Sequence, residues 1–243
     1  MSIKSALKRM IPKKYHKKLA QIRTEYIRGY AEKSYSQEGE DMVLRRIFRR
    51  QEKGFYVDVG AYHPKRFSNT YFLYRKGWRG INIDATPGVM AEFNKVRKRD
   101  VNLNVGVSLV PGELTYYMFD EPALNSFDEK LAKERSKKTA NKIKKRVKIK
   151  TVTLESILDE QLGSNKMDLL SVDVEGFDLQ VLQSNNWDRF RPRYVLVESL
   201  GYDLSRIREC PIYQFLKGKG YEVFAKTFYT FFYKDEKEKV EYD

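Results

Sequence analysis

The feature that most constrains the fold of this chain is the segment 54–64, with the sequence GFYVDVGAYHP. Its aromatic and β-branched residues lie between glycines, which predicts a short buried strand. Asp58 interrupts the apolar run near its end, where a carboxylate is costly unless a partner pairs with it. Gly60 then permits a tight turn and lets a ligand approach the backbone. The segment therefore predicts a strand of an open α/β sheet with a ligand at its carboxyl end.

A second predicted strand ends in the same way. Residues 80–85, GINIDA, place Asp84 where open α/β folds hold the ribose hydroxyls of a nucleotide-type cofactor. Only Gly60 lies in the first turn, so the chain lacks the G-x-G-x-x-G pattern that cradles a pyrophosphate. This argues against NAD and FAD and favours a cofactor with a ribose but no phosphate, such as S-adenosylmethionine. The alternative is an ordinary βα turn with a capping acid.

Two further acids follow a third apolar run, residues 167–176, MDLLSVDVEG. Asp173 and Glu175 flank its carboxyl end, and at strand spacing their side chains point to the same side. Two close carboxylates repel each other, which raises one pKa unless a cation, a basic side chain or a proton intervenes. Glu198 ends another buried strand, 193–198. We expect these acids to carry chemistry, and capping of a helix N-terminus is the alternative.

Other segments complete an α/β pattern. Ser36 can cap a helix that runs to about residue 50, with Gln37 and Glu38 in its first turn. A third strand is expected over 101–107, followed by a hairpin at Pro111 and Gly112. The segments 221–226 and 229–233 predict two final strands joined by a short turn.

The length, composition and net charge of the chain limit the classes of protein to which it can belong. The 243 residues, 41% of them hydrophobic, predict one large folded domain with appendages. The net charge of +14 indicates an anionic partner, such as nucleic acid, an anionic membrane face or phosphorylated sugars. Residues 130–150 hold eleven Lys/Arg and one acid, and could form a lid, a docking surface or a solvated helix. Cys210 is the single cysteine, so no internal disulfide can form and a reducing cytosol fits.

The N-terminal segment differs in its sequence pattern from the rest of the chain. Residues 3–31 show the pattern of a basic amphipathic helix broken at Pro12, which can lie on an anionic membrane or pack with a solvated basic face. No apolar run approaches the roughly 20 residues that span a bilayer. We expect a cytoplasmic protein with peripheral contact to the inner membrane face through residues 1–30. The expected parts are a helical extension over 1–33, a folded domain over 34–233 with a basic insert at 128–150, and a loose charged tail over 234–243.

From about Tyr35 to Tyr233, the chain resembles the FkbM family of S-adenosylmethionine-dependent methyltransferases. The resemblance rests on the order of six blocks: SQEGED at 36–41, VDVGA at 57–61, SNTY at 68–71, GWRG at 77–80, IDA at 83–85 and DLLSVDVEG at 168–176. It implies a Rossmann-like class I methyltransferase fold, whose mostly parallel central sheet has a reversed last strand. It also implies O-methylation, often of sugars in glycans, lipopolysaccharide or natural products. The first 30 residues and the basic insert are not covered.

The same resemblance implies roles for individual residues. The implied cofactor-binding set is Gln37, Asp58, Gly60, Ser68, Asn69, Asp84, Asn104 and Ser108. Within it, Asp84 takes the ribose hydroxyls, and Asn104 and Ser108 lie near the adenine edge. Asp173 and Glu175 form an acidic pair that faces the acceptor.

The inferred reaction is direct methyl transfer from a sulfonium to a hydroxyl oxygen, for which the protein aligns the reacting atoms and removes a proton. Asp173 or Glu175 is the candidate base, and His63 is the alternative. A divalent cation, Mg²⁺ or Mn²⁺, would lower the pKa of the hydroxyl, with Asp173 and Glu198 as candidate ligands. The expected acceptor is a saccharide or glycolipid precursor. The alternatives are an RNA 2′-O-methyltransferase, for which no RNA-binding motif is recognisable, and a non-catalytic module that binds anionic glycans or membranes.

Overall fold

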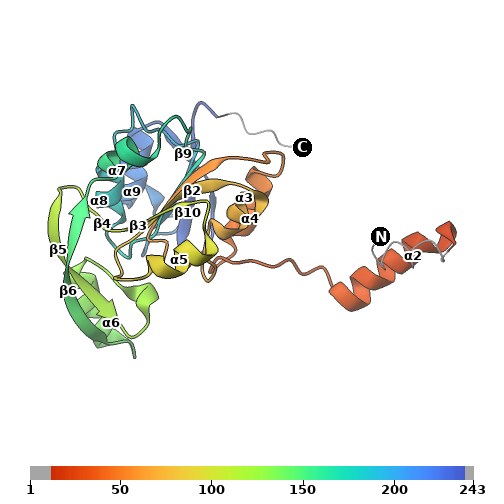
Figure 1. Ribbon diagram of the computed structural model, residues 1–243, viewed down its shortest axis with the longest axis horizontal. Helices are drawn as coiled ribbons and strands as arrows, with labels where there is room; N and C mark the ends of the chain where they lie inside the picture. The colour runs from red at the N-terminus through yellow and green to blue at the C-terminus, as the bar shows by residue number, and fades with distance from the viewer. Residues whose placement is uncertain (1–11, 239–243) are drawn as a thin grey trace. The chain divides into compact units, whose positions relative to one another are not determined.

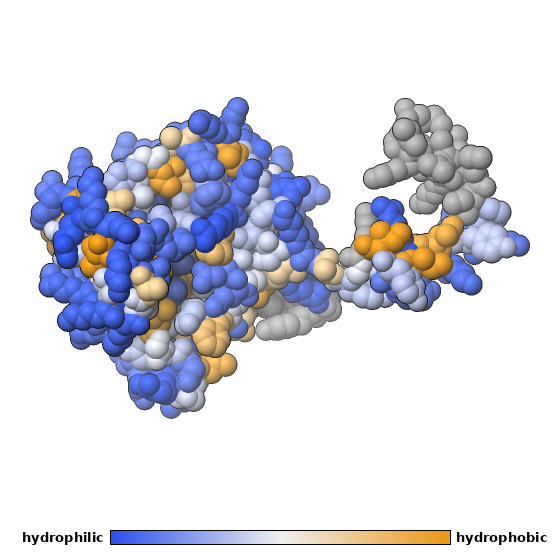
Figure 2. Space-filling model, turned by 90° about the horizontal axis from the view of Figure 1, so that it is seen from below, coloured by the Kyte–Doolittle hydropathy of each residue, from blue (hydrophilic) through white to orange (hydrophobic). Residues whose placement is uncertain are grey.

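The computed structural model describes residues 12–238 and divides into two compact units, with the boundary between Ser34 and Tyr35 (Figure 1). In the first unit, α2 (Lys13–Ile22) begins after Pro12 and continues into a π-helical turn, Arg23–Arg28. No residue of α2 is buried, and Figure 2 shows hydrophobic side chains exposed on this N-terminal segment. The parts of the predicted helix and tail that fall on residues 1–11 and 239–243 lie outside the described residues. No described helix is long and apolar enough to cross a bilayer.

The second unit is built on a seven-stranded sheet. Its strands, in spatial order, are β3 (Val101–Asn104), β2 (Arg79–Asp84), β1 (Phe55–Val59), β7 (Leu169–Val172), β8 (Tyr194–Glu198), β10 (Thr230–Asp235) and β9 (Tyr221–Lys226). Neighbouring strands are parallel, except that β10 runs antiparallel to both β8 and β9. The predicted α/β fold with a mostly parallel central sheet is therefore confirmed. Every residue of β1 and β7 is buried, as expected for parallel strands covered on both faces.

Helices cover both faces of this sheet (Figure 1). They are α3 (Glu40–Ile47), α4 (Tyr71–Lys76), α5 (Met90–Val96), α7 (Leu154–Gln161), α8 (Asp178–Gln183) and α9 (Pro211–Gly218). Tyr56 of β1 belongs to the hydrophobic cluster of α3 and α4, whereas Val57 and Val59 belong to the cluster of α7, α8 and α9. Successive side chains of a strand point to opposite faces, so one strand contributes to both layers of the core.

A smaller sheet of three strands has the order β4-β6-β5. Its strands are β4 (Gly106–Val107), β6 (Ile143–Val152) and β5 (Gly112–Phe119), and α6 (Glu129–Lys138) packs on β5 through Ala132. The predicted hairpin at Pro111 and Gly112 is wrong, because β4 and β5 each pair with β6 and not with each other. Strand β5 pairs with β6 along almost its whole length, whereas β4 has only two residues that could pair with β5. The basic insert is thus a regular helix followed by most of a strand.

The order of the central strands positions a site. After β1 the chain adds β2 and β3 on one side, and β7 and β8 later join on the other side of β1. The carboxyl ends of β1, β2 and β7 therefore meet where the direction of winding reverses. In open α/β sheets, ligands bind at this point.

Candidate functional site

A cavity opens at the carboxyl ends of β1 and β2, next to the turn that follows β7. The small sheet lines it through residues that include Val107 and Tyr116, and the loop between β5 and α6 lines it through residues that include Asn125 and Phe127. Asp84, at the end of β2, also lines it. An apolar cavity with a few converging polar groups is the usual form of a small-molecule site. We refer to it below as the cofactor cavity.

Both carboxylate oxygens of Asp84 are held by the backbone. The N–H of Tyr62 donates to Oδ2 at 2.8 Å, and the N–H of Thr86 donates to Oδ1 at 2.7 Å. Burial raises the pKa of Asp84, and these two donors act in the opposite direction. A carboxylate has about four acceptor positions, so Asp84 can still accept hydrogen bonds from the hydroxyls of a ligand.

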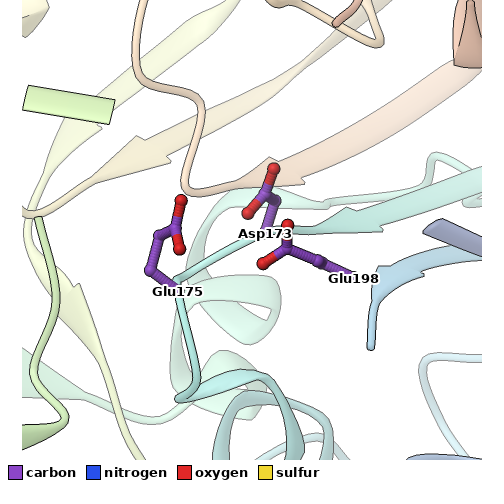
Figure 3. Close-up of side chains that lie close together, drawn as sticks. All are labelled: Asp173, Glu175 and Glu198. Carbon is purple, nitrogen blue, oxygen red and sulfur yellow. The ribbon is translucent and has the colours of Figure 1, made fainter. Parts of the chain in front are cut away.

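The turn after β7 carries the acidic pair. Strand β7 ends at Val172, so the prediction that Asp173 and Glu175 are aligned by strand spacing is wrong. Glu175 instead adopts a left-handed backbone with φ of 55°, and Asp178 accepts the N–H groups of Val174 and Gly176 at 3.0 Å. This turn brings Asp173 and Glu175 close to Glu198 at the end of β8 (Figure 3). Oxygens of the three carboxyl groups lie within 4.8 Å of one another.

These carboxyl groups perturb one another. Burial and then the charges of Glu198 and Glu175 raise the pKa of Asp173 well above its ordinary value. Burial, followed by the charge of Glu175, raises the pKa of Glu198 to about 9. Burial also raises the pKa of Glu175, but the guanidinium of Arg135, 2.6 Å from its Oε2, opposes that shift. Glu198 is therefore protonated at neutral pH, whereas Arg135 balances the charge of Glu175.

A second hollow begins on the other side of Asp173. Asp173 and Glu198 line it together with residues of the segments 37–40, 67–69 and 229–230. Asp173 thus lines both spaces. A side chain shared by two neighbouring spaces can act on a group that passes between ligands held in each.

The structure brings together part of the predicted cofactor-binding set. Gly60 and Asp84 line the cofactor cavity, whereas Gln37 and Asn69 line the second hollow. Gln37 precedes α3, which begins at Glu40 and has Gly39, and not the predicted Ser36, as its N-cap. Gly60 has φ of 83°, and a Cβ on it would lie 1.7 Å from the carbonyl oxygen of Asp173. The turns after β1 and β7 can therefore meet only because residue 60 is glycine.

The other four members of that set make contacts within the fold. Their hydrogen bonds join Asp58 to the hydroxyl of Thr70, Ser68 to Arg97 and to the N–H of Tyr71, Asn104 to the carbonyls of Asp84 and Thr86, and Ser108 to the carbonyl of Val110. None of the four is among the residues that line the cofactor cavity or the second hollow. Their part in cofactor binding stays a prediction.

His63 also lines neither space. Its Nδ1 accepts the N–H groups of Lys65 and Arg66 at 3.0 and 2.9 Å, and its Nε2 lies 3.3 Å from Glu92. Nδ1 thus has its partners within the turn after β1, and the partner of Nε2 lies in α5. The geometry gives Asp173, and not this histidine, access to a ligand.

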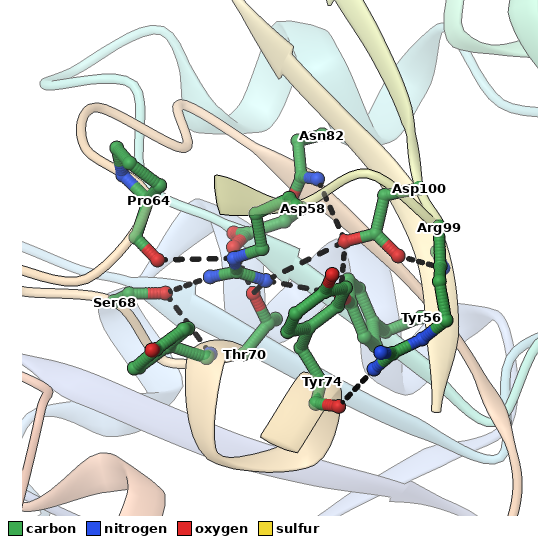
Figure 4. A network of polar contacts seen from close by, with 12 residues as sticks. Tyr56, Asp58, Pro64, Ser68, Thr70, Tyr74, Asn82, Arg99 and Asp100 are labelled. Carbon is green, nitrogen blue, oxygen red and sulfur yellow. Dashed lines mark hydrogen bonds and ion pairs between the residues drawn. The ribbon is translucent and has the colours of Figure 1, made fainter. Parts of the chain in front are cut away.

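Arg97 is a fully buried residue that the sequence analysis did not single out. It lies 3.7 Å from Asp100, whose side chain is also fully buried. Figure 4 labels Asp100 and other residues of this network, which include Tyr56, Pro64, Ser68 and Thr70. The Arg97 guanidinium donates to the hydroxyls of Tyr56 and Thr70 at 3.0 Å, to the carbonyl of Pro64 at 3.0 Å and to the hydroxyl of Ser68 at 2.6 Å. The network joins β1 to the loop that carries Asn69, and so fixes one wall of the second hollow.

Two other residues that hold the acidic turn, Ser126 and Arg135, were also not predicted from the sequence. Ser126 donates its hydroxyl to the carbonyl of Glu175 at 2.6 Å, and Arg135 pairs with the Glu175 side chain. Ser126 lies in the loop between β5 and α6, and Arg135 lies in α6, so this part of the chain helps to hold the acidic turn. Arg135 is one of eleven cations between residues 130 and 150, and no local pattern separates it from the others.

Comparison with known proteins agrees with this geometry. Residues 58–223 match the family described as Methyltransferase FkbM domain. A stretch of 62 residues is 39% identical to CyanoP of Synechocystis sp., and covers 24% of this chain and 33% of that protein. The chain thus spans about a third of this curated relative, and no solved structure matches it. Because the family match covers most of the chain and contains Asp84, Asp173 and Glu175, this protein belongs to the FkbM methyltransferase family.

Proposed function

We propose that the protein transfers a methyl group from S-adenosylmethionine to a hydroxyl of a saccharide, in a glycan or glycolipid precursor. The observation that carries this proposal is the position of Asp173 between the cofactor cavity and the second hollow. The strand order, with β10 antiparallel, supports a Rossmann-like class I methyltransferase fold with a reversed last strand. Synthesis of a polysaccharide in the cytoplasm is the corresponding role.

The cofactor cavity fits the nucleoside part of S-adenosylmethionine. Asp84 offers acceptors to two ribose hydroxyls, and the apolar walls, which include Ile83 and Phe127, suit a flat adenine ring. When bound, this cofactor supplies an activated methyl group on a positively charged sulfur. The carboxylates of Asp173 and Glu175 on the cavity wall favour a positive charge nearby.

Asp173 is the base in this proposal. A general base works best when its pKa lies near the working pH, and burial among other acids raises the pKa of Asp173 in that direction. Glu175 is a poorer candidate because Arg135 already engages it at 2.6 Å. Glu198 is protonated at neutral pH, so it can donate a hydrogen bond that orients the acceptor.

We further propose that the site binds a divalent cation, Mg²⁺ or Mn²⁺. Two oxygens on opposite sides of an ion with bonds of 2.0–2.1 Å are about 4.2 Å apart. Carboxyl oxygens that lie within 4.8 Å of one another can reach such an ion after small rotations. Asp173 and Glu198 would hold it, since Glu175 is paired with Arg135, and Glu198 would release its proton when the ion binds. The ion would lower the pKa of the acceptor hydroxyl.

The test combines calorimetric titration with S-adenosylmethionine and a methyl-transfer assay on nucleotide sugars, oligosaccharides and RNA, with and without EDTA. Asp84→Ala should abolish cofactor binding, whereas Asp173→Asn should abolish transfer and retain binding. Asp203→Asn, at an exposed carboxylate outside the site, is the matched control and should change neither. A folded wild-type protein that does not bind the cofactor refutes the proposal. Transfer to RNA alone would instead favour the RNA methyltransferase.

We also propose that the N-terminal unit contacts an anionic membrane surface, which would make the protein cytoplasmic and peripheral. Leu19 and Ile22 of α2 are exposed, on a helix that also carries Lys13, Lys14, Lys17 and Lys18. Exposed apolar residues beside lysines are typical of helices that lie in a membrane interface. Sedimentation with vesicles that contain phosphatidylglycerol should carry the full chain, but not the chain that lacks residues 1–33. Equal binding of both would refute this contact.

A further inference from the structure

The second hollow is assembled from segments that are far apart in the sequence. The side chain of Glu38 accepts the N–H of Tyr229 at 2.9 Å, and the side chain of Glu40 accepts the hydroxyl of Thr227 at 2.8 Å. These contacts tie the start of α3 to the turn between β9 and β10. The shape of the hollow is therefore fixed by specific hydrogen bonds and is not a chance gap between loops.

Two aromatic rings line the hollow. Phe67 and Tyr229 are each 38% exposed. The guanidinium of Arg66 lies 4.3 Å from the centroid of the Phe67 ring, and the ring of Phe228 stands edge-on to Tyr229 at 4.7 Å. Each ring is thus supported by a neighbour and still offers surface to a ligand. The C–H face of a pyranose is apolar and packs against aromatic surfaces of this kind.

The polar lining suits hydroxyl groups. Gln37 and Asn69 contribute amides, which both donate and accept hydrogen bonds. The Oε2 atom of Glu198 is buried and has no hydrogen-bond partner among the described residues. Leaving a buried polar atom unpaired is costly, and a hydroxyl of a ligand would satisfy it.

The hollow differs in charge from the chain as a whole. Four acidic residues line it, namely Glu38, Glu40, Asp173 and the protonated Glu198, and none of the described lining residues is a lysine or arginine. The chain as a whole carries a net charge of +14. A phosphate or carboxylate in the hollow would meet carboxyl groups and no cation, whereas an uncharged ring would meet acceptors for its hydroxyls.

We propose that the second hollow is the acceptor subsite and that it holds an uncharged pyranose ring, stacked on Tyr229 and Phe67, with a hydroxyl directed at Asp173. This inference rests on the proposed function and adds a substrate class to it. Uronic acids and sugar phosphates are excluded from this subsite, although anionic groups elsewhere on the acceptor are compatible with the basic exterior.

The test uses the full chain saturated with S-adenosylhomocysteine, and saturation-transfer NMR with free sugars. The neutral probes are the methyl glycosides of glucose, galactose and mannose, and the charged probes are glucuronic acid and glucose 6-phosphate. At least one neutral glycoside should bind, and the charged probes should not. Tyr229→Ala should weaken that binding about tenfold, as expected when an aromatic contact residue is truncated.

Tyr26 supplies the matched control. It is an exposed tyrosine of the segment Arg23–Arg28, 80% exposed, and is not part of the lining, so Tyr26→Ala should leave glycoside binding unchanged. Both variants should keep wild-type affinity for S-adenosylmethionine, which shows that they fold. Equal effects of the two substitutions, binding of the charged probes, or no neutral binding by a protein that binds the cofactor would each overturn this inference alone. Absence of cofactor binding by the folded wild-type protein would overturn the proposed function as well.

Discussion

Replacement of Arg97 by methionine tests whether the buried network holds the site together. The substitution removes the charge that faces Asp100 and the donors to four oxygens, while it keeps most of the side-chain volume. Breaking one partner of a buried ion pair costs about 3–5 kcal/mol, because the remaining charge is left uncompensated. Asp100 keeps three other donors, from Tyr56, Gly80 and Asn82, so we expect the lower end, about 3 kcal/mol.

Urea denaturation and thermal melting measure this loss. A cost of about 3 kcal/mol corresponds to a decrease in Tm of about 6–12 °C for a domain of this size. Burial raises the pKa of Asp100, so the loss should shrink as pH falls and the carboxylate gains a proton. Adding Asp100→Asn should recover at least about 1 kcal/mol of the loss. Lys98→Met, at the exposed cation next to Arg97, should change stability by less than about 0.5 kcal/mol. A cost below about 1 kcal/mol for Arg97→Met, or strict additivity with Asp100→Asn, would refute the reasoning.

Three further predictions concern the site itself. Gly60→Ala should lower the free energy of unfolding by more than about 2 kcal/mol and weaken S-adenosylmethionine binding, since its Cβ would overlap the carbonyl oxygen of Asp173; melting and calorimetry measure both effects. The raised pKa of Glu198 means that the folded state binds this proton more tightly than the unfolded chain, so its contribution to stability is present at low pH and is lost as pH rises to about 9. Glu198→Gln should therefore flatten the fall of Tm between pH 5 and 9, and an unchanged slope would contradict the assignment. Arg135→Met should cost about 2–3 kcal/mol in urea denaturation and reduce methyl transfer, whereas the exposed Lys137→Met should do neither.

Features that depend on the order of residues within a short segment could be predicted from the sequence. Acids at the ends of short apolar runs located Asp84, Asp173 and Glu198, because parallel strands in sequence order bring their carboxyl ends to one edge. The reason given for the pairing of Asp173 with Glu175 was wrong, since a left-handed turn and not the strand pleat aligns them. Glutamate rarely adopts a left-handed backbone, so the residue type at position 175 does not indicate this conformation.

Features that depend on distant parts of the chain could not be predicted. Pro111 and Gly112 favour a local hairpin, but the partner of β5 is β6, which begins more than twenty residues after β5 ends. Arg97 stands in the run KVRKRD, where Lys95, Lys98 and Arg99 are all exposed. Only its hydrogen bonds to Tyr56 of β1 and to Ser68 of the loop after β1 distinguish Arg97 from these cations, and the pattern of charges alone does not reveal them.

Backbone strain is concentrated at the walls of the two ligand spaces. Among the described residues, three that are not glycine have a left-handed backbone: Tyr62, Phe67 and Glu175. Tyr62 and Glu175 line the cofactor cavity, and Phe67 lines the second hollow. Each such residue costs about 1–3 kcal/mol and persists only when its surroundings hold it in place. Asp84 holds the N–H of Tyr62, and Ser126 and Arg135 hold Glu175. Contacts from other segments therefore hold these residues in backbone conformations that they would not adopt on their own. When those contacts are removed, the geometry of the site should be lost before the core of the sheet.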